Sequence, residues 1–407
     1  MLRPANYSTQ QVQHSMETWR TPNYISPFSF LQLMRDVRLE RLADVLVNYS
    51  LEIKKGDIFL ISGSELTLPL IREVYKKALL AGAHPYVRIY DEDLSEIFYK
   101  FASDDQLKFV SPIAEYEIRK IDARLSILGP KNTKFLTNVD SKKQALHHAA
   151  TEKLHRIFLN RAAKKELRWC LTQYPTPAAA QDAEMSLEEY ENFVFKAGYV
   201  NKRNPIKIWN EIKERQEKIV KLLSSKKKIR IVANDTDLTL SVEGRKWINC
   251  HGKENFPDGE IFTGPVENSA NGYVSFSFPS FHGGREVRDI YLEFKRGKVI
   301  KAKASKGEKF LKSMLSMDKG ASRIGEFSFG TNYAIKRYTN NTLFDEKIGG
   351  TIHIAVGSGY PETGSRNKSG LHWDMVVDMR KGGEVYADGE LIYKDGKFLE
   401  DLFEKES

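Results

Sequence analysis

The chain has 407 residues, which suffice for two or three domains, and its 41% hydrophobic and 29% charged residues exclude disordered and collagen-like proteins. Its net charge of +9 calls for a test of nucleic-acid binding. No segment approaches the roughly 20 apolar residues that a membrane-spanning helix needs, so we predict no membrane partner. The only cysteines, Cys170 and Cys250, exclude a disulfide framework and a cysteine-rich zinc site.

The first 35 residues are predicted to form an N-terminal extension. They are mostly polar, contain Pro4, Pro22 and Pro27, and lack the apolar core of a secretory signal. Together with the two cysteines, this composition predicts a cytoplasmic protein.

Helices and strands alternate over residues 36–228, which we predict to be an α/β domain. An amphipathic helix through Leu42 and Leu46 begins the pattern. It continues with a strand at 57–61, a helix at 69–81, strands at 85–90 and 125–128, a helix at 142–165, a strand at 168–172 and a loop at 173–180. Such alternation is typical of a mostly parallel sheet. No GxGxxG motif follows the first strand, so dinucleotide binding has no support.

The segment from Lys202 to Arg230 is strongly basic. Its apolar residues recur at helical spacing, so the charges are expected on the solvent face of one helix. A nucleic-acid-binding module is the non-enzymatic alternative. The interleaved aromatic residues of a single-strand binding platform are nearly absent, with Trp209 alone, so we predict no nucleic-acid partner.

Residues 229–407 are predicted to form a second, β-rich domain. Short strand-like runs joined by glycine-containing turns favour an antiparallel sheet. The runs lie at 229–233, 237–242, 273–278, 290–294 and 299–304.

Two glutamates of this domain stand in short glycine-rich segments. Glu260 follows Pro257 and Gly259, where the backbone can bend to present a carboxylate, although a loop glutamate is usually only solvated. Glu326 is a lone acid among apolar and small residues, and a buried carboxylate needs a cation or several donors to stay ionised. The alternative for Glu326 is an ion pair with Arg323.

Histidines and further acids follow downstream. Glu346 and His353 lie on either side of a Gly-Gly pair, and His353 begins an apolar run that predicts a buried strand. A lone histidine there is more often a hydrogen-bonded core residue. His372 and Asp374 are two residues apart, so on a strand they face the same way and suit Zn²⁺, Co²⁺, Mn²⁺ or Fe²⁺. These six groups together could hold a pair of ions, with one carboxylate bridging them.

The order of these segments resembles peptidase family M29, the aminopeptidase T and aminopeptidase S type of metallo-aminopeptidases. The likeness covers the chain from about Leu39 onward, including the segment from Pro175 to Ala180. In the C-terminal half it rests on the segments 245–247, 255–260, 323–326, 341–346, 353–357 with Tyr360, and 371–374.

The resemblance implies an α/β N-terminal domain and a β-rich α+β catalytic domain that binds two divalent metal ions (Zn, Co, Mn or Mg). It implies hydrolysis of N-terminal residues from peptides with a free N-terminus by a metal-activated water, in a homodimer. Tyr360 would be the active-site phenol, and Glu326 is our choice for the bridging ligand or base. The implied metal ligands are Glu260, Glu326, Glu346, His353, His372 and Asp374.

A second enzymatic alternative uses the same scaffold. Ring-cleaving dioxygenases that resemble this family hold one Fe²⁺, and His353, His372 and Asp374 would satisfy that site. The presence of Glu260 and Glu326 favours the two-ion peptidase, because a mononuclear site does not require them.

Overall fold

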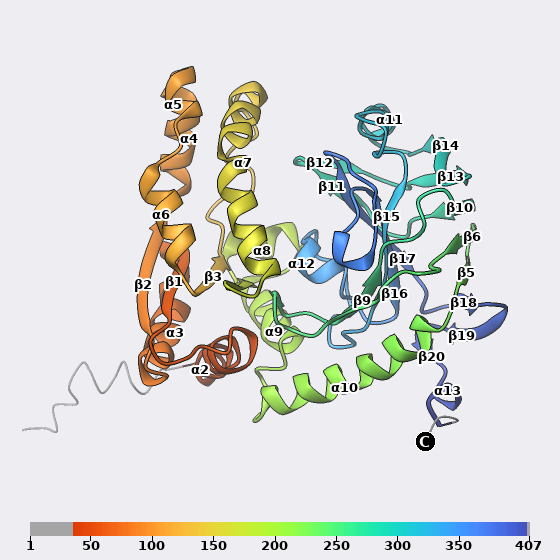
Figure 1. The fold of residues 1–407 in the computed structure, drawn as a ribbon, viewed down its shortest axis with the longest axis horizontal. Coiled ribbons are helices and arrows are strands. Elements are labelled where there is room, and N and C mark those ends of the chain that lie inside the picture. The colour runs from red at the N-terminus through yellow and green to blue at the C-terminus, as the bar shows by residue number, and fades with distance from the viewer. Residues whose placement is uncertain (1–35, 405–407) are drawn as a thin grey trace, which may run out of the picture. The chain divides into compact units, whose positions relative to one another are not determined.

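The computed structural model describes residues 36–404, so the predicted extension at 1–35 lies outside the described residues. From Arg38 onward the chain belongs to one compact unit. Figure 1 shows a parallel sheet with its helices in the first half and a β-rich region in the second. A search of the helices within 36–404 finds none with the length and apolar character to cross a membrane.

The first half forms a five-stranded parallel sheet in the order β2-β1-β3-β4-β8, as the alternating pattern predicts. The last strand is supplied by the second half of the chain, only four residues before Glu260. The strands are β1 (Ile58–Ser64), β2 (His84–Tyr90), β3 (Ala123–Leu128), β4 (Arg168–Gln173) and β8 (Asn255–Phe256).

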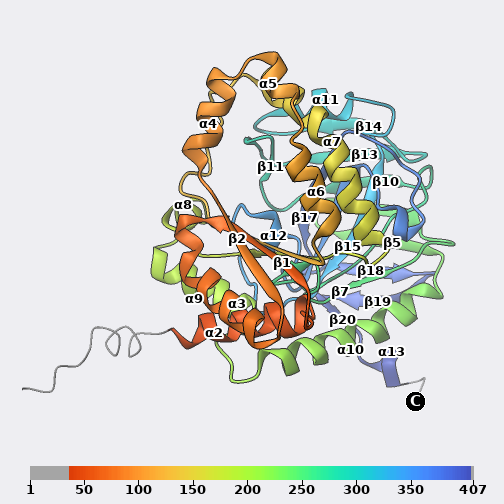
Figure 2. The same ribbon diagram turned by 60° about the vertical axis from the view of Figure 1, so that its left-hand side comes forward.

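Helices pack on both faces of this sheet (Figure 2). Phe59 and Leu125 on one face belong to the core that α2 (Val37–Asp44), α3 (Leu68–Leu80) and α9 (Leu187–Ala197) complete. On the other face, Phe158 of α7 (Ser141–Ala163) packs against Leu60, and α6 (Pro112–Lys120) lies beside α7. Between β2 and α6 the chain forms α4 (Glu92–Phe101) and α5 (Asp104–Lys108).

The loop predicted at 173–180 is wrong in its second half, because α8 (Pro177–Asp182) begins there. The Thr176 side chain accepts a hydrogen bond from the Ala179 N–H, and Pro177 occupies the first turn, where its missing N–H costs nothing. These residues are a helix start, not a loop interior.

The basic segment is the amphipathic helix α10 (Pro205–Ser224), as predicted. It buries Trp209, Ile219 and Leu223 and exposes ion pairs such as Lys207–Glu211. The buried Gln216 amide donates to the backbone carbonyl of Glu260 at 3.1 Å. This helix therefore supports the strand on which Glu260 lies.

Besides the two-stranded hairpin of β11 (Ser280–His282) and β12 (Arg285–Val287), the second half contains two antiparallel sheets, which confirms the β-rich prediction. One has eight strands in the order β14-β13-β10-β6-β5-β18-β19-β20, and the other has five in the order β17-β16-β15-β9-β7. The larger sheet comprises β5 (Lys228–Ala233), β6 (Thr236–Ser241), β10 (Asn271–Ser275), β13 (Tyr291–Lys295), β14 (Lys298–Lys303), β18 (Glu384–Ala387), β19 (Glu390–Lys394) and β20 (Lys397–Phe398). The smaller sheet comprises β7 (Ile248–Cys250), β9 (Glu260–Thr263), β15 (Ile324–Gly330), β16 (Thr351–Gly357) and β17 (His372–Asp378).

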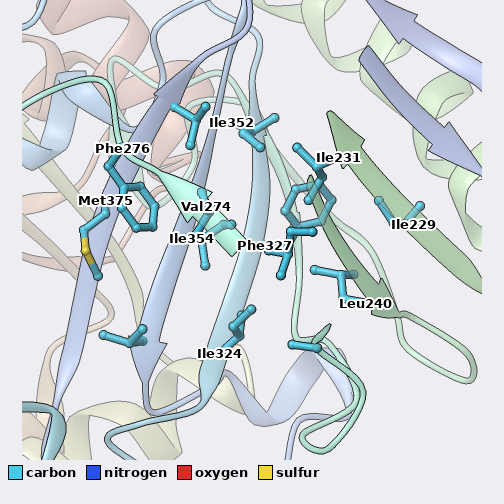
Figure 3. Close-up of a cluster of buried hydrophobic side chains, with 14 of the residues drawn as sticks. Ile229, Ile231, Leu240, Val274, Phe276, Ile324, Phe327, Ile352, Ile354 and Met375 are labelled. Atoms are coloured by element: carbon cyan, nitrogen blue, oxygen red, sulfur yellow. The ribbon is translucent and has the colours of Figure 1, made fainter. Parts of the chain in front are cut away.

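One face of the five-stranded sheet packs on the eight-stranded sheet. Figure 3 shows Phe327, Ile354 and Met375 of the smaller sheet packed in one cluster with Ile231 and Val274 of the larger one. Because side chains alternate along a strand, the residues between them turn to the opposite face. That opposite face carries the polar groups.

Candidate metal centre

The five-stranded sheet brings the predicted ligands to the face away from its apolar core. Glu260 begins β9, Glu326 lies on β15, His353 on β16, and His372 and Asp374 on β17. The register pairs Glu326 with Ala355 and Ala355 with Asp374. Residues far apart in sequence thus meet on neighbouring strands.

A β-bulge turns Glu326 toward this face. Ile324 lies in the apolar core, and the pairing of β15 with β16 shifts between Ile324 and Glu326. The extra residue, Gly325, reverses the alternation, so Glu326 points away from the core. Only glycine fits there, because a Cβ would lie 2.2 Å from the carbonyl oxygen of Ser358.

The side chains form two groups of three possible ligands that share Glu326. In the first group, His353 Nε2 lies 3.1 Å from Glu326 Oε1 and 3.5 Å from Glu260 Oε2. In the second, His372 Nε2 lies 3.5 Å from Glu326 Oε2 and 3.4 Å from Asp374 Oδ2. Within each group the ligand atoms lie within 4.8 Å of one another. Glu326 therefore faces each histidine with a different oxygen.

Both histidine rings are held by backbone carbonyls. His353 Nδ1 lies 3.2 Å from the carbonyl oxygen of Glu346, and His372 Nδ1 lies 2.8 Å from that of Ser358. Because a carbonyl can only accept, these contacts assign a proton to Nδ1, and Nε2 is the nitrogen that faces the carboxylates and can bind an ion once it has lost its own proton. Metal-binding histidines are commonly oriented in this way.

Glu346 is placed at the edge of this arrangement. Its carboxyl group hydrogen-bonds to Asp374 and lies 2.6 Å from the Lys347 ammonium, but it belongs to neither group of three. Its neighbour Asp345 turns away and accepts hydrogen bonds from the backbone N–H and the hydroxyl of Thr339.

Burial of so many charges shifts their pKa values. His353 and His372 have pKa values raised to about 9 and about 10, because neighbouring carboxylates outweigh burial, which acts to lower them. Burial raises the pKa of Glu346 to about 8 and also raises that of Glu326. Burial would raise the pKa of Asp374 too, but His372 outweighs it and holds the pKa below the usual value.

Tyr360 stands beside the second group. Its ring lies 5.2 Å from that of His372 and 5.2 Å from that of Phe262, measured between centroids. Burial and the charges of Glu326 and Asp374 raise the pKa of its phenol, so the hydroxyl keeps its proton. The group can therefore donate a hydrogen bond.

The ion pair of Glu326 with Arg323 is not formed. Arg323 instead donates to the backbone carbonyl of Glu267 at 2.7 Å. The histidine-and-aspartate set of a mononuclear iron site is not one of the groups of three, because His353 groups with Glu260 and Glu326, and His372 with Glu326 and Asp374.

Sequence reasoning missed Lys347, which is 1% exposed and contacts two carboxylates. It lies in the segment between Glu346 and His353, and its residue type alone suggests a solvent-exposed lysine. The one signal in the sequence was its position directly after a predicted ligand and before a predicted buried strand.

The donor set fits divalent cations. Carboxylate oxygens and imidazole nitrogens converge in a buried place. Five carboxylates with the one ammonium of Lys347 cannot all stay ionised there without further positive charge, and they are those of Asp258, Glu260, Glu326, Glu346 and Asp374. A β-sheet face with these groups defines a metal-dependent enzyme.

Comparison with known proteins gives the family. The family model described as thermophilic metalloprotease (M29) matches residues 35–398. The chain belongs to this family and is a metal-dependent peptide hydrolase.

Individual relatives are similar over most of their length. Aminopeptidase 2 of Geobacillus stearothermophilus is 26% identical over 88% of this chain and 95% of its own. Aminopeptidase AmpS of Bacillus subtilis is 26% identical over 89% of this chain and 98% of its own. The solved structure of wild-type AmpT from Thermus thermophilus has the same fold, with a TM-score of 0.78 at 24% identity, covering 89% of this chain and 99% of that one.

Proposed function

We propose that this protein is an aminopeptidase that hydrolyses N-terminal residues from peptides with a water activated between two divalent metal ions. The balance of buried charge is the observation that carries the two-ion site. Asp258, Glu260, Glu326, Glu346 and Asp374 could each carry a negative charge, and Lys347 offsets one of the five. Two divalent ions would offset the remaining four.

Glu326 is the bridging ligand in this proposal. One ion would take Glu260, Glu326 and His353, and the other Glu326, His372 and Asp374, with Glu346 beside Asp374 as a further ligand. The different oxygens that Glu326 turns toward the two histidines support this assignment. When bound, the ions would supply a hydroxide-like nucleophile and polarise the scissile carbonyl.

The protein's own groups would orient the reaction. The carbonyls of Glu346 and Ser358 fix the two imidazoles, so their Nε2 atoms stay aimed at the centre. The protonated phenol of Tyr360 would donate a hydrogen bond to the oxygen that becomes negative when water attacks. The carboxylate of Glu346, which belongs to neither group of three, would accept the proton of the nucleophilic water.

A cavity of about 190 Å³ lies beside the second group and is the proposed place for the N-terminal residue of the peptide. Glu346, His372 and Asp374 line it together with Phe281 and Tyr338. A free α-amino group entering there would meet carboxylates. The larger hollow of about 730 Å³ lies over the eight-stranded sheet and contains none of the predicted site residues.

Hydrolysis of aminoacyl p-nitroanilides tests the proposal. Chelated protein should be inactive, and activity should return when Zn²⁺, Co²⁺, Mn²⁺ or Mg²⁺ is added singly. N-acetylated substrates are the matched control and should not be cleaved, because they lack the free amine. Equal cleavage of acetylated and free substrates would reject the aminopeptidase assignment.

We also propose a homodimer in the cytoplasm. Large apolar side chains of α4 to α6, namely Leu94, Phe101, Phe109, Ile113 and Tyr116, are well exposed, which supports an interface between two copies. Both cysteines are free, which suits a reducing compartment. Analytical ultracentrifugation tests the homodimer, and a monomer at micromolar concentration would contradict it.

A further inference from the structure

Lys347 is a fully buried ammonium group inside the proposed centre. Its residue is 1% exposed, and its Nζ lies 3.2 Å from Glu260 Oε1 and 2.6 Å from Glu346 Oε2. Asp258, also 1% exposed, is a third carboxylate whose charge acts on it. Burial alone would neutralise a lysine, so these carboxylates are needed to hold its charge.

The two contacts of Lys347 reach one carboxylate from each side of the centre. Glu260 belongs to the group with His353, whereas Glu346 hydrogen-bonds to Asp374 in the group with His372. Lys347 therefore links the two groups at a second point, in addition to Glu326.

The ammonium occupies one oxygen of Glu260 and leaves the other facing the centre. Oε1 of Glu260 contacts Lys347, while Oε2 lies 3.5 Å from His353 Nε2 and 3.3 Å from the Ser328 hydroxyl, which donates to it. A carboxylate held in this way can offer a single oxygen to an ion. Without the ammonium it could rotate or bind through both oxygens.

The backbone of Lys347 is fixed by hydrogen bonds of its own N–H and carbonyl groups. The Lys347 N–H donates to the carbonyl of Phe344 at 3.0 Å, and the Lys347 carbonyl accepts from the Asn332 N–H at 3.0 Å. These bonds fix the backbone from which the side chain starts, and the contacts with Glu260 and Glu346 hold its ammonium end.

We propose that Lys347 is a positioning residue, a cation supplied by the protein that sets the orientation of Glu260 and Glu346 as monodentate ligands of the two ions. The inference rests on the proposed function. Burial of the Lys347 ammonium group costs free energy. A residue that only filled space would not need this charge, since an apolar side chain of similar volume would do the same.

Lys347→Met tests the proposal, because Met has a similar shape without the donors. Co²⁺ is the probe: chelated protein is titrated with Co²⁺, and the visible d–d bands of the loaded protein report its coordination. We expect altered bands and about 10–100-fold weaker Co²⁺ binding, as loss of groups that orient metal ligands typically causes. The kcat for an aminoacyl p-nitroanilide should fall while KM stays near the parent value.

Lys226→Met is the matched control. Lys226 pairs with Glu390 at 2.7 Å and its side chain is 16% exposed, but it lies between α10 and β5, and Glu390 begins β19 of the eight-stranded sheet. This variant should keep the parent bands and affinity. If Lys347→Met also keeps the parent bands, Co²⁺ affinity and kcat, the proposal is overturned.

A second variant keeps the test decisive if Lys347→Met does not fold. Lys347→Met/Asp258→Asn removes one negative charge together with the positive one and should restore folding. Altered Co²⁺ bands in the folded double variant support positioning, whereas parent bands and affinity would show that only charge balance mattered. Failure of the proposed function is seen separately, in a parent protein that binds fewer than two Co²⁺ or cleaves no aminoacyl substrate.

Discussion

The parallel sheet and the five-stranded antiparallel sheet differ in how their buried polar groups are satisfied. Open parallel sheets usually bind ligands at the carboxyl ends of their strands, where the strand order reverses. Here that edge, between β1 and β3, is closed: the Ser64 hydroxyl donates to the Gly129 carbonyl, and Thr67 packs against Gly63 and Gly129. The antiparallel sheet instead collects buried carboxylates and imidazoles on one face.

The two sheets therefore have different roles, because the parallel sheet supports the fold and the antiparallel sheet carries the groups of the proposed metal site. The hydroxyls of Ser64 and Thr67 donate to backbone carbonyls, so the edge between β1 and β3 needs no ligand to satisfy them. Carboxylates that cannot all be ionised without cations leave the antiparallel sheet incomplete. Changes in the antiparallel sheet should therefore affect turnover and metal binding, and changes at the edge of the parallel sheet should affect stability.

Among changes in the antiparallel sheet, replacement of Glu326 by Gln should have the largest effect on the rate of hydrolysis. Size and shape are kept while charge and basicity are lost, so the fold should survive. Because the bridging carboxylate holds both ions, the rate should fall by at least as much as the loss of a positioned base usually costs, about 10²–10⁴-fold, and metal content should drop. Steady-state kinetics, circular dichroism and metal analysis check this, and a folded variant with the parent rate would mean that Glu326 is not the centre of the site.

Tyr360→Phe should lower kcat by about 10²–10³-fold, the cost of removing one donor to a developing oxyanion. Metal content and KM should change little, because the proposal makes the phenol a hydrogen-bond donor to the reacting oxygen and not a metal ligand. Parallel measurement of kcat, KM and bound metal separates this outcome from a ligand role, which would instead lower metal content.

The metal-free protein should lose stability as pH rises, and the loaded protein should not. His353, His372 and Glu346 have folded-state pKa values of about 9, about 10 and about 8, all above the unfolded values of 6.5 and 4.5. The metal-free fold thus binds more protons than the unfolded chain. The stability that these protons contribute is present at low pH and is lost as the pH rises to about 10. Bound metal replaces these protons. Thermal melts across this range, with chelator and with Co²⁺, should diverge, and parallel curves would contradict the account.

Gly129→Ala should show the opposite pattern and the smallest effect. Its Cβ would lie 2.3 Å from Thr67 Cγ2, so the closed edge must shift. We expect a loss of about 1–3 kcal/mol, typical of overpacking, with unchanged kcat and metal content in the folded fraction. Denaturant unfolding measures the loss, and a fall in turnover at full folding would show that the edge of the parallel sheet takes part in the chemistry.

Much of the fold follows from sequence because its signals are local. The period of apolar residues identified the strands from β1 to β4 and helix α10, and the glycine-rich turns indicated the antiparallel half. The start of α8 was missed because the Pro-Ala segment was assigned to a loop, although Thr176 and Pro177 form a helix start. That β8 joins the parallel sheet depends on tertiary packing, which no local pattern encodes.

The site was predictable only in part. The separation of two residues between His372 and Asp374 predicts a shared face, and the other ligands came from a family resemblance. The ligand roles themselves stay predictions. The bulge at Gly325 and the contacts of Lys347 depend on the pairing of strands that are distant in sequence, so sequence periodicity could not give them.

Metal content is the most direct test of the two-ion centre. Protein purified without added metal, chelated, reloaded with Zn²⁺ or Co²⁺ and freed of excess ion should contain two ions per chain by plasma mass spectrometry and should cleave aminoacyl substrates. One iron per chain, or a fully active protein with a single ion, would contradict the account.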